Sequence, residues 1–149
     1  MNPDRALVLQ FLRGGGAPLA MTSNPLASDL SGSIRELDAT RGTALLAFEP
    51  SQRFLQGAQI LQGGALATML DFAMAFAAHA RLEAQEKAFA TASLTVHFLR
   101  AAPAPARYLA RGRIVQMGSR LLYAEADARR DDDDRLVASA SAVMALVGP

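Results

Sequence analysis

The chain has 149 residues, about the length of one domain. Its 51% hydrophobic and 19% charged residues can bury a full core, which excludes a disordered or fibrous chain. More of the chain is hydrophobic than the surface of a small protein needs, so an apolar subunit interface is expected. The net charge of +1 gives no reason to expect a nucleic-acid partner. The lack of cysteine excludes disulfides and thiolate metal sites. It is also typical of the reducing cytoplasm, where we place the protein.

The N-terminal part, residues 1–31, is expected to be a helix and a loop that pack on the main domain, residues 32–149. The short apolar stretch Ala6–Leu12 is followed by no small-residue cleavage site, which predicts an amphipathic helix over residues 1–13 rather than a signal peptide. Residues 14–31 are expected to form a loop, because glycines and prolines interrupt them.

Two short strands and a long helix come next. Ser33–Leu37 and Thr43–Glu49 are predicted strands on either side of a turn at Gly42. After a connection over residues 51–61, a helix is predicted from about Gly64 to Glu86, because alanine, leucine, methionine and phenylalanine favour helix throughout.

The segment Ile60–Ala80 is apolar and long enough to cross a bilayer, which raises a membrane alternative. Against it, Asp71 lies in the middle of the segment, where a charge in lipid is costly. A helix that is apolar on nearly every side must then be surrounded by protein.

After the helix the hydrophobic period changes to two, which predicts antiparallel strands over Ala92–Arg100, Arg107–Met117, Leu121–Arg130 and Arg135–Val147. The four consecutive aspartates Asp131–Asp134 indicate a solvated turn, because packed like charges repel. A metal site there is the alternative, although calcium loops need interleaved glycine and a distal carboxylate. The fold class predicted from this order is α+β: a curved antiparallel sheet wrapped around one long central helix.

Asp71 is the first candidate functional residue, since a carboxylate among apolar helix residues needs a partner. The structural alternative is an aspartate at the helix rim that is hydrogen-bonded to a backbone or hydroxyl group. The functional interpretation is supported by Gln62, Gly63 and Gly64, which lie at the helix start, where free backbone N–H groups and the helix dipole polarise an acyl carbonyl. The structural alternative for the glycines is close packing of the helix on the sheet.

The stretch GAQILQGGALATMLDFAMAFAA, followed by ATASLTVHFLRAAP, resembles the hotdog-fold acyl-CoA thioesterases of the phenylacetate-pathway and 4-hydroxybenzoyl-CoA type. The family pattern is a polar Asn or Gln, a His-Gly-Gly helix start, an acid eight residues after the first glycine, and a strand that opens with Ser or Thr. The resemblance extends from about Ser33 to Val147 and implies the hotdog fold.

The resemblance implies four catalytic residues. Asp71 matches the acid that serves as nucleophile or general base, and Gly63 matches the residue whose amide polarises the thioester carbonyl. Gln56 matches the Asn or Gln near the attacking water and the leaving sulfur, and Thr91 matches the hydroxyl that helps to hold this water. Gln62 and Gly64 are expected to bind substrate.

The chain departs from the family pattern at two positions. Gln62 stands where the family commonly has histidine; a glutamine can donate a hydrogen bond but cannot carry a proton. Ala75 stands one turn after the acid, where some members have threonine.

Other candidates are weaker. His79 is expected to meet the dipole at the helix end, and His97 to lie on the polar face of its strand. Ser139 and Ser141 lack the sequence context of a serine nucleophile. The arginines that could meet the phosphates of coenzyme A are Arg100, Arg107, Arg111, Arg113 and Arg120.

The function predicted is hydrolysis of acyl-CoA-type thioesters, with no metal or bound organic cofactor, coenzyme A being part of the substrate. Neither a nucleic acid nor a membrane is an expected partner. In the family the acid and the glycine come from different subunits, so a homodimer is the minimal unit and a homotetramer is expected. The first alternative is a non-catalytic acyl-CoA-binding domain on the same fold, which Gln62 favours. The second is a hydratase or dehydratase, which would need a histidine beside the acid. The third is a membrane or scaffold protein.

Overall fold

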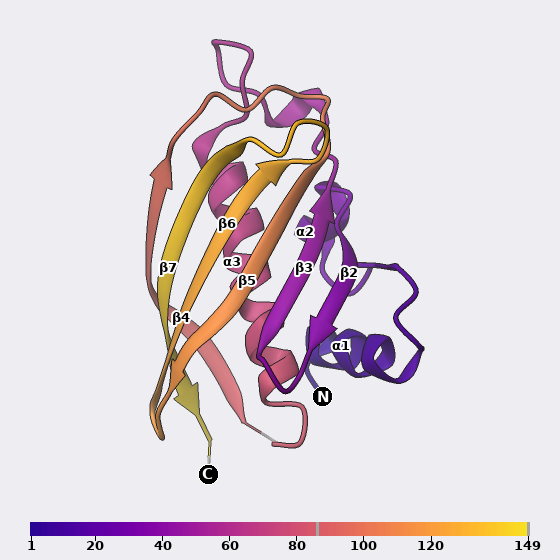
Figure 1. Cartoon of the computed structure of the whole chain (residues 1–149), viewed down its shortest axis with the longest axis vertical. Helices are drawn as coiled ribbons and strands as arrows, with labels where there is room; N and C mark the ends of the chain where they lie inside the picture. Colours follow the sequence, from indigo (N-terminus) through magenta and orange to yellow (C-terminus); the bar gives the residue numbers. More distant parts are fainter. Residues whose placement is uncertain (86, 149) are drawn as a thin grey trace.

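The protein is described by a computed structural model that covers residues 1–85 and 87–148. One antiparallel sheet with the strand order β1-β2-β3-β5-β6-β7-β4 curves around a single long helix, α3, which lies against one of its faces (Figure 1). The predicted architecture of a curved sheet around one central helix, the hotdog fold, is confirmed. The strands are β1 Leu19–Ala20, β2 Ser33–Asp38, β3 Thr43–Phe48, β4 Ala88–Phe98, β5 Tyr108–Met117, β6 Leu121–Arg130 and β7 Leu136–Val147. The helices are α1 Pro3–Arg13, α2 Pro25–Asp29, the 3-10 turn η1 Gln52–Phe54 and α3 Gly63–Arg81.

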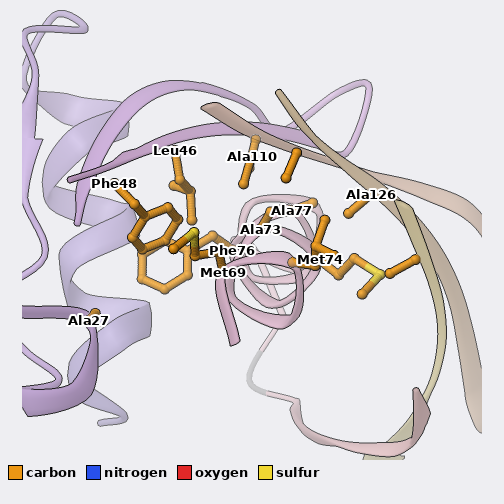
Figure 2. Close-up of a cluster of buried hydrophobic side chains, with 14 of the residues drawn as sticks. Ala27, Leu46, Phe48, Met69, Ala73, Met74, Phe76, Ala77, Ala110 and Ala126 are labelled. Atoms are coloured by element: carbon orange, nitrogen blue, oxygen red, sulfur yellow. The ribbon is translucent and has the colours of Figure 1, made fainter. Parts of the chain in front are cut away.

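Helix α3 is packed on most of its circumference. Figure 2 shows Leu46 and Phe48 of β3 and Ala110 of β5 gathered around the helix, and all three are buried. At Gly112 of β5 the two backbones approach so closely that a Cβ would lie 2.2 Å from the carbonyl oxygen of Ala73. Only glycine allows this approach, which fixes β5 against the middle of α3.

One face of α3 keeps partial exposure. Gly64, Ala67, Thr68, Asp71 and Ala75 are exposed or half-buried, and their spacing of three or four residues puts them on one side of the helix. All of them except Asp71 are small or hydroxyl-bearing residues. This stripe is therefore a surface on which another backbone can come close to the helix.

Strand β4 is the edge of the sheet opposite β1, and among the described residues it pairs with β7 alone. Most of its residues are exposed on both faces, including Leu94 at 38% and Phe98 at 54%. The uncovered edge strand and the uncovered stripe of α3 account for hydrophobic residues beyond those that the core uses. Unpaired edge strands with apolar side chains are sites where another chain adds to a sheet.

Several predicted boundaries need correction. The helix ends at Arg81 rather than near Glu86, because the N–H of Leu82 closes it on the carbonyls of Ala78 and Ala80; residue 86 lies outside the described residues. The strand predicted from Ala92 starts four residues earlier, at Ala88.

The loop predicted over residues 14–31 is wrong at two places, where β1 and α2 form. The signal for α2 is Asn24 followed by Pro25: the Asn24 side chain caps the N–H groups of Leu26 and Ala27, and proline suits the first helical position. Helix α1 buries Leu7, Val8 and Phe11, as an amphipathic helix should. The division of the chain at residue 31 stays a prediction.

In the described part of the chain, no helix is long and apolar enough to cross a bilayer.

Candidate functional site

The carboxylate of Asp71 meets the hydroxyl of Thr91. Asp71 lies in the middle of α3 and is half-buried, and Thr91 lies on β4. Thr91 Oγ1 donates a hydrogen bond of 2.9 Å to Asp71 Oδ1. A register shift between Thr91 and Ser93 interrupts the alternation of β4 at this point, and Thr91 pairs there with the buried Met144. The bulge thus turns the Thr91 side chain toward the helix.

This hydrogen bond orients the carboxylate. One oxygen of Asp71 is held by Thr91, and no hydrogen bond from a described side chain reaches the other, Oδ2. A carboxylate that is fixed by one oxygen can present the second to a water molecule or a carbonyl carbon. The rim position of Asp71 and its hydroxyl partner also match the structural alternative, an aspartate that is hydrogen-bonded to a hydroxyl group at the helix rim.

Gln62, Gly63 and Gly64 form the start of α3. Gln62 is the residue before the helix, and its side chain makes no capping hydrogen bond. Its carbonyl accepts the N–H of Ala65 at 2.9 Å, which leaves the N–H groups of Gly63 and Gly64 in the helix's unpaired first turn. A helix start of this kind attracts a negatively charged or strongly polarised oxygen.

The two glycines have different surroundings. A Cβ on Gly63 would lie 3.0 Å from Cζ of Phe98, the last residue of β4, so the phenyl ring rests directly on this glycine. A Cβ on Gly64 would meet nothing within 4 Å. The packing alternative therefore applies to Gly63, whereas Gly64 leaves the helix backbone open to a neighbouring molecule.

The backbone just before the helix start is anchored by two hydrogen bonds. The N–H of Gln62 bonds to the carbonyl of Phe54 at 2.8 Å, and the N–H of Leu61 bonds to the carbonyl of Ala102 at 2.7 Å. These contacts join η1 and the segment after β4 to the first turn of α3. The N–H groups of the first turn of α3 are thereby held in one direction.

Gln56 lies in a tight loop before the helix, and none of its described hydrogen bonds goes to Asp71 or Thr91. Its Oε1 accepts the N–H of Ala58 at 2.8 Å, and its own N–H bonds to the carbonyl of Ile60 at 2.8 Å. The side-chain oxygen is thus occupied in the loop, and the amide NH₂ is the group that Gln56 has left for a ligand.

Gly63 and Asp71 are too far apart to act on one carbonyl within one chain. They are eight residues apart on the same helix, so at 1.5 Å per residue their backbones are separated by about 12 Å. The structure thus brings Asp71 and Thr91 together in one chain, and separates this pair from Gly63 and its neighbours at the helix start.

His79 does not meet the helix dipole as a cation at neutral pH. It is 8% exposed, between Phe76 and Phe89, with ring centroids 6.2 and 4.6 Å from its own. Burial lowers the pKa of His79 to about 4. The side chain is therefore neutral at neutral pH and belongs to the core.

A hollow of about 770 Å³ lies elsewhere, and its lining includes neither Asp71 nor the helix start. It is lined by side chains of the opposite face of the sheet, among them His97, Ser139 and Ser141. Arg113 and Glu125 form an ion pair there. Arg107 is paired as well, with Glu49 and Asp131.

Asp131–Asp134 form a turn whose carboxylates face arginines, such as Arg130 and Arg135. In residues 1–85 and 87–148, no three His, Cys, Asp or Glu side chains are grouped so that they could hold a metal ion.

Two features of the site were not predicted from the sequence. The contact of Phe98 with Gly63 depends on how β4 curves around α3. The short helix α2 was missed, although Asn24 and Pro25 signalled it; its residue Leu26 lines a groove beside Gly64.

Comparisons with known proteins agree with this architecture. The Thioesterase superfamily profile matches residues 58–137. A phenylacetic acid degradation-related protein from Ralstonia eutropha JMP134 is 28% identical, with a TM-score of 0.78 over 93% of this chain and 98% of that one. A thioesterase family protein from Silicibacter pomeroyi is 26% identical, with a TM-score of 0.79 over 95% and 99% of the two chains.

The PaaI protein from the phenylacetic acid degradation operon of E. coli is 19% identical, with a TM-score of 0.78 over 99% of this chain and 96% of that one, which is a likeness of fold. Curated protein sequences give no significant match.

Proposed function

Because the chain belongs to the thioesterase superfamily, we propose that it hydrolyses acyl-CoA thioesters to the free acid and coenzyme A, with Asp71 as nucleophile or general base. Thioester hydrolysis is the reaction that the family membership supports; the acyl-CoA substrate and the roles of individual residues are our proposal. The observation that carries it is the carboxylate of Asp71, oriented by Thr91 on a helix whose first turn is open at Gly64.

The thioester carbonyl is placed at the first turn of α3. The N–H of Gly63 donates to the carbonyl oxygen, and the positive end of the helix stabilises the charge that develops on this oxygen during attack. Gly64 leaves room beside it, since nothing lies within 4 Å of the position of its missing Cβ. Gln62 has a free side-chain amide at the same place and donates to the substrate rather than transferring a proton.

Asp71 supplies the chemistry at the carbonyl carbon. As general base it takes a proton from water while the water oxygen bonds to the carbon; the tetrahedral intermediate then releases the thiolate, which takes up the proton. As nucleophile its oxygen bonds to the carbonyl carbon, the C–S bond breaks and the thiolate leaves, taking a proton from solvent; water then hydrolyses the acyl anhydride to the free acid and restores the carboxylate. Thr91 holds the carboxylate in both routes, and the amide of Gln56 is proposed to hold the water or the leaving sulfur.

The site requires two copies of the chain, because Gly63 and Asp71 of one helix are about 12 Å apart. If two α3 helices pack antiparallel and cross near Ala67, midway between these residues, Gly63 of each copy comes level with the partner's Asp71. The exposed stripe of α3 carries small residues that permit this approach, and β4 offers an uncovered edge on the same side. We therefore propose a homodimer as the active unit.

The mechanism uses no metal and no bound organic cofactor, since the carboxylate and the helix start supply the base and the oxyanion donor. The homotetramer and the cytoplasmic location remain predictions from the sequence.

A non-catalytic acyl-CoA-binding domain is the second candidate. The observation that favours it is Gln62, which replaces the family histidine and cannot carry a proton. Tight binding of acyl-CoA without release of thiol over a broad panel of thioesters would select this function.

The test of hydrolysis is thiol release from a panel of acyl-CoA thioesters by the wild-type protein and by Asp71→Asn. We expect Asp71→Asn to lower kcat by at least roughly a hundredfold, the size of a general acid–base contribution. The matched control is Asp134→Asn, in a turn with φ +58° that asparagine adopts well. Wild-type turnover by a folded Asp71→Asn protein would contradict the assignment.

A further inference from the structure

Strand β4 contacts helix α3 at the proposed site and again near the end of the helix. At the site, Thr91 Oγ1 donates to Asp71 Oδ1 at 2.9 Å. Near the helix end, the ring of Phe89 lies against the ring of His79, with 4.6 Å between the ring centroids. Phe89 and Thr91 are two residues apart on β4, so their side chains lie on the same face of the strand. A contact that fixes Phe89 on the helix therefore also limits where the Thr91 hydroxyl can lie.

The start of β4 has little support from the sheet. It is an edge strand, and its first two residues, Ala88 and Phe89, pair with Val147 and Leu146 at the end of β7. Val147 is itself 51% exposed. Strand ends open more easily than strand centres, so contacts with α3 are needed to keep the start of β4 in one place.

His79 gives this contact a fixed point. It is buried, and it lies edge-on to Phe76 of the same helix, with 6.2 Å between the ring centroids. Phe76 in turn meets Phe72, and Phe72 meets Phe48 of β3, with centroids 6.4 and 6.3 Å apart. Aromatic rings at these separations attract each other. This ladder of rings from β3 holds the imidazole against which Phe89 packs.

The connection between α3 and β4 is held as well. Nη2 of Arg5, on α1, donates to the carbonyls of Glu83 and Gln85 at 3.0 and 3.1 Å. Helix α1 precedes residues 58–137, which match the family profile, so this support comes from outside the segment shared with the family. His79 therefore fixes the strand that follows the connection, and Arg5 fixes the connection itself.

We propose that His79 and Arg5 are positioning residues for the hydrolysis proposed above, on which this inference rests. Together they hold the start of β4 on α3 and so keep Thr91 on one oxygen of Asp71. His79 lies eight residues after Asp71, about 12 Å along the helix, and does not touch the reacting carbonyl. Its effect reaches the carboxylate through β4, because a displaced Thr91 leaves the carboxylate free to turn away from the carbonyl carbon.

The first test measures thiol release from the best acyl-CoA thioester by His79→Ala and His79→Phe. We expect His79→Ala to lower kcat about tenfold, with KM within about twofold of wild type, because the carboxylate is misplaced while the helix start is intact. His79→Phe keeps a ring against Phe89 and should restore kcat to within about twofold of wild type. Wild-type kcat in a folded His79→Ala protein, or no recovery in His79→Phe, would overturn the proposal.

The matched control is Ile34→Ala, which also truncates a buried side chain. Ile34 lies on β2, at the other end of the strand order from β4. It should leave kcat within about twofold of wild type, since distant sites act independently. A loss of kcat equal to that of His79→Ala would show that any core truncation slows the reaction, and would overturn the proposal.

A double-mutant cycle with Thr91→Val shows whether His79 acts through Thr91. Valine keeps the shape of threonine but lacks the hydroxyl. In the Thr91→Val background we expect His79→Ala to lower kcat by less than about twofold, because the hydrogen bond that it disturbs is already gone. A loss of about tenfold in both backgrounds would show an effect that does not pass through Thr91, and would overturn the proposal.

Arg5→Met takes the place of His79→Ala in this cycle if the latter does not fold. Methionine keeps an apolar chain at this position but lacks the donors to Glu83 and Gln85. We expect kcat to fall about threefold in the wild-type background and to stay unchanged in Thr91→Val. Equal losses in the two backgrounds would contradict a positioning role.

Urea unfolding of the four proteins of the cycle, at one protein concentration, separates this inference from the proposed reaction. Thr91→Val should lower the unfolding midpoint at most about half as far in His79→Ala as in wild type, because His79→Ala has already weakened the bond to Asp71. With this coupling but no thioester hydrolysed by wild type, the positioning role stands and the proposed hydrolysis fails. Additive midpoint shifts, in a protein whose thiol release depends on Asp71, would overturn the positioning role and leave the hydrolysis intact.

Discussion

At the scale of single residues, the proposed chemistry depends on one carboxylate and one backbone N–H. Thr91 fixes the carboxylate of Asp71 at 2.9 Å, and the first turn of α3 supplies the N–H groups. Neither group is reactive by its residue type alone. Orientation by a hydroxyl and alignment with the helix dipole make them usable for attack on a carbonyl.

The role of the Gly63 amide is tested by Gly63→Pro. Proline fits the first position of a helix but has no N–H, and the extended backbone of Gln62, with ψ 135°, is compatible with a following proline. Loss of one oxyanion donor should lower kcat roughly 100- to 1,000-fold. Thiol-release kinetics with the best thioester measure this.

Gly63→Ala is the matched control, because its Cβ meets the ring of Phe98 as the proline ring does but the N–H is retained. The exposed Phe98 side chain can move aside in both variants. If Gly63→Ala and Gly63→Pro lose equal activity, the effect comes from packing on Phe98, and the amide is not the oxyanion donor.

The sequence was informative about residue types and less so about their contacts. The alternation along β4 and the apolar composition of the helix are readable in the residues, so the α+β class was predicted from them. The pairing of Gly63 with Asp71 and the hotdog fold were implied by the resemblance to the family. The contact of Thr91 with Asp71 depends on a bulge in β4, and the contact of Phe98 with Gly63 depends on the curvature of the sheet. Such long-range geometry leaves no periodic signal in a single sequence.

At the scale of elements, the C-terminal end of α3 is held by aromatic packing and by α1. His79 lies between Phe76 of the same helix and Phe89 of β4. Arg5 of α1 donates to the carbonyls of Glu83 and Gln85, at 3.0 and 3.1 Å, just after the helix. The end of α3 opposite the proposed site is thereby fixed to both β4 and the N-terminal helix.

His79 makes the stability of this packing depend on pH. Burial lowers the pKa of His79 from 6.5 to about 4, so the unfolded chain binds a proton in a range where the folded chain does not. Its contribution is fully present above pH 6.5 and falls as the pH drops toward 4. From pH 7 to pH 5 we expect a loss of about 2 kcal/mol from this group.

Urea unfolding of wild type and His79→Phe at the two pH values isolates this contribution, because all other groups titrate in both proteins. His97→Gln, at an exposed position on β4, serves as control and should follow wild type. Equal pH dependence of wild type and His79→Phe would show that His79 is not the group responsible.

At the scale of the whole molecule, the helix stripe and strand β4 explain the surplus of apolar residues. The core uses most of the apolar side chains of α3, yet β4 and the stripe from Gly64 to Ala75 remain partly uncovered. In the dimer that we propose, a second copy covers both and brings its Asp71 to the helix start. The subunit interface that composition predicts stays a prediction, and we propose that it lies there.

The central claim, that one site is shared between two copies, is tested most directly with a mixed dimer. Asp71→Asn and Gly63→Pro chains carrying different tags are co-expressed, and the doubly tagged dimer is purified and assayed for thiol release. Each such dimer holds one site with both residues intact, so about half of the wild-type activity per dimer is expected, although each variant alone is nearly inactive. A mixed dimer as inactive as its two parents would contradict the account.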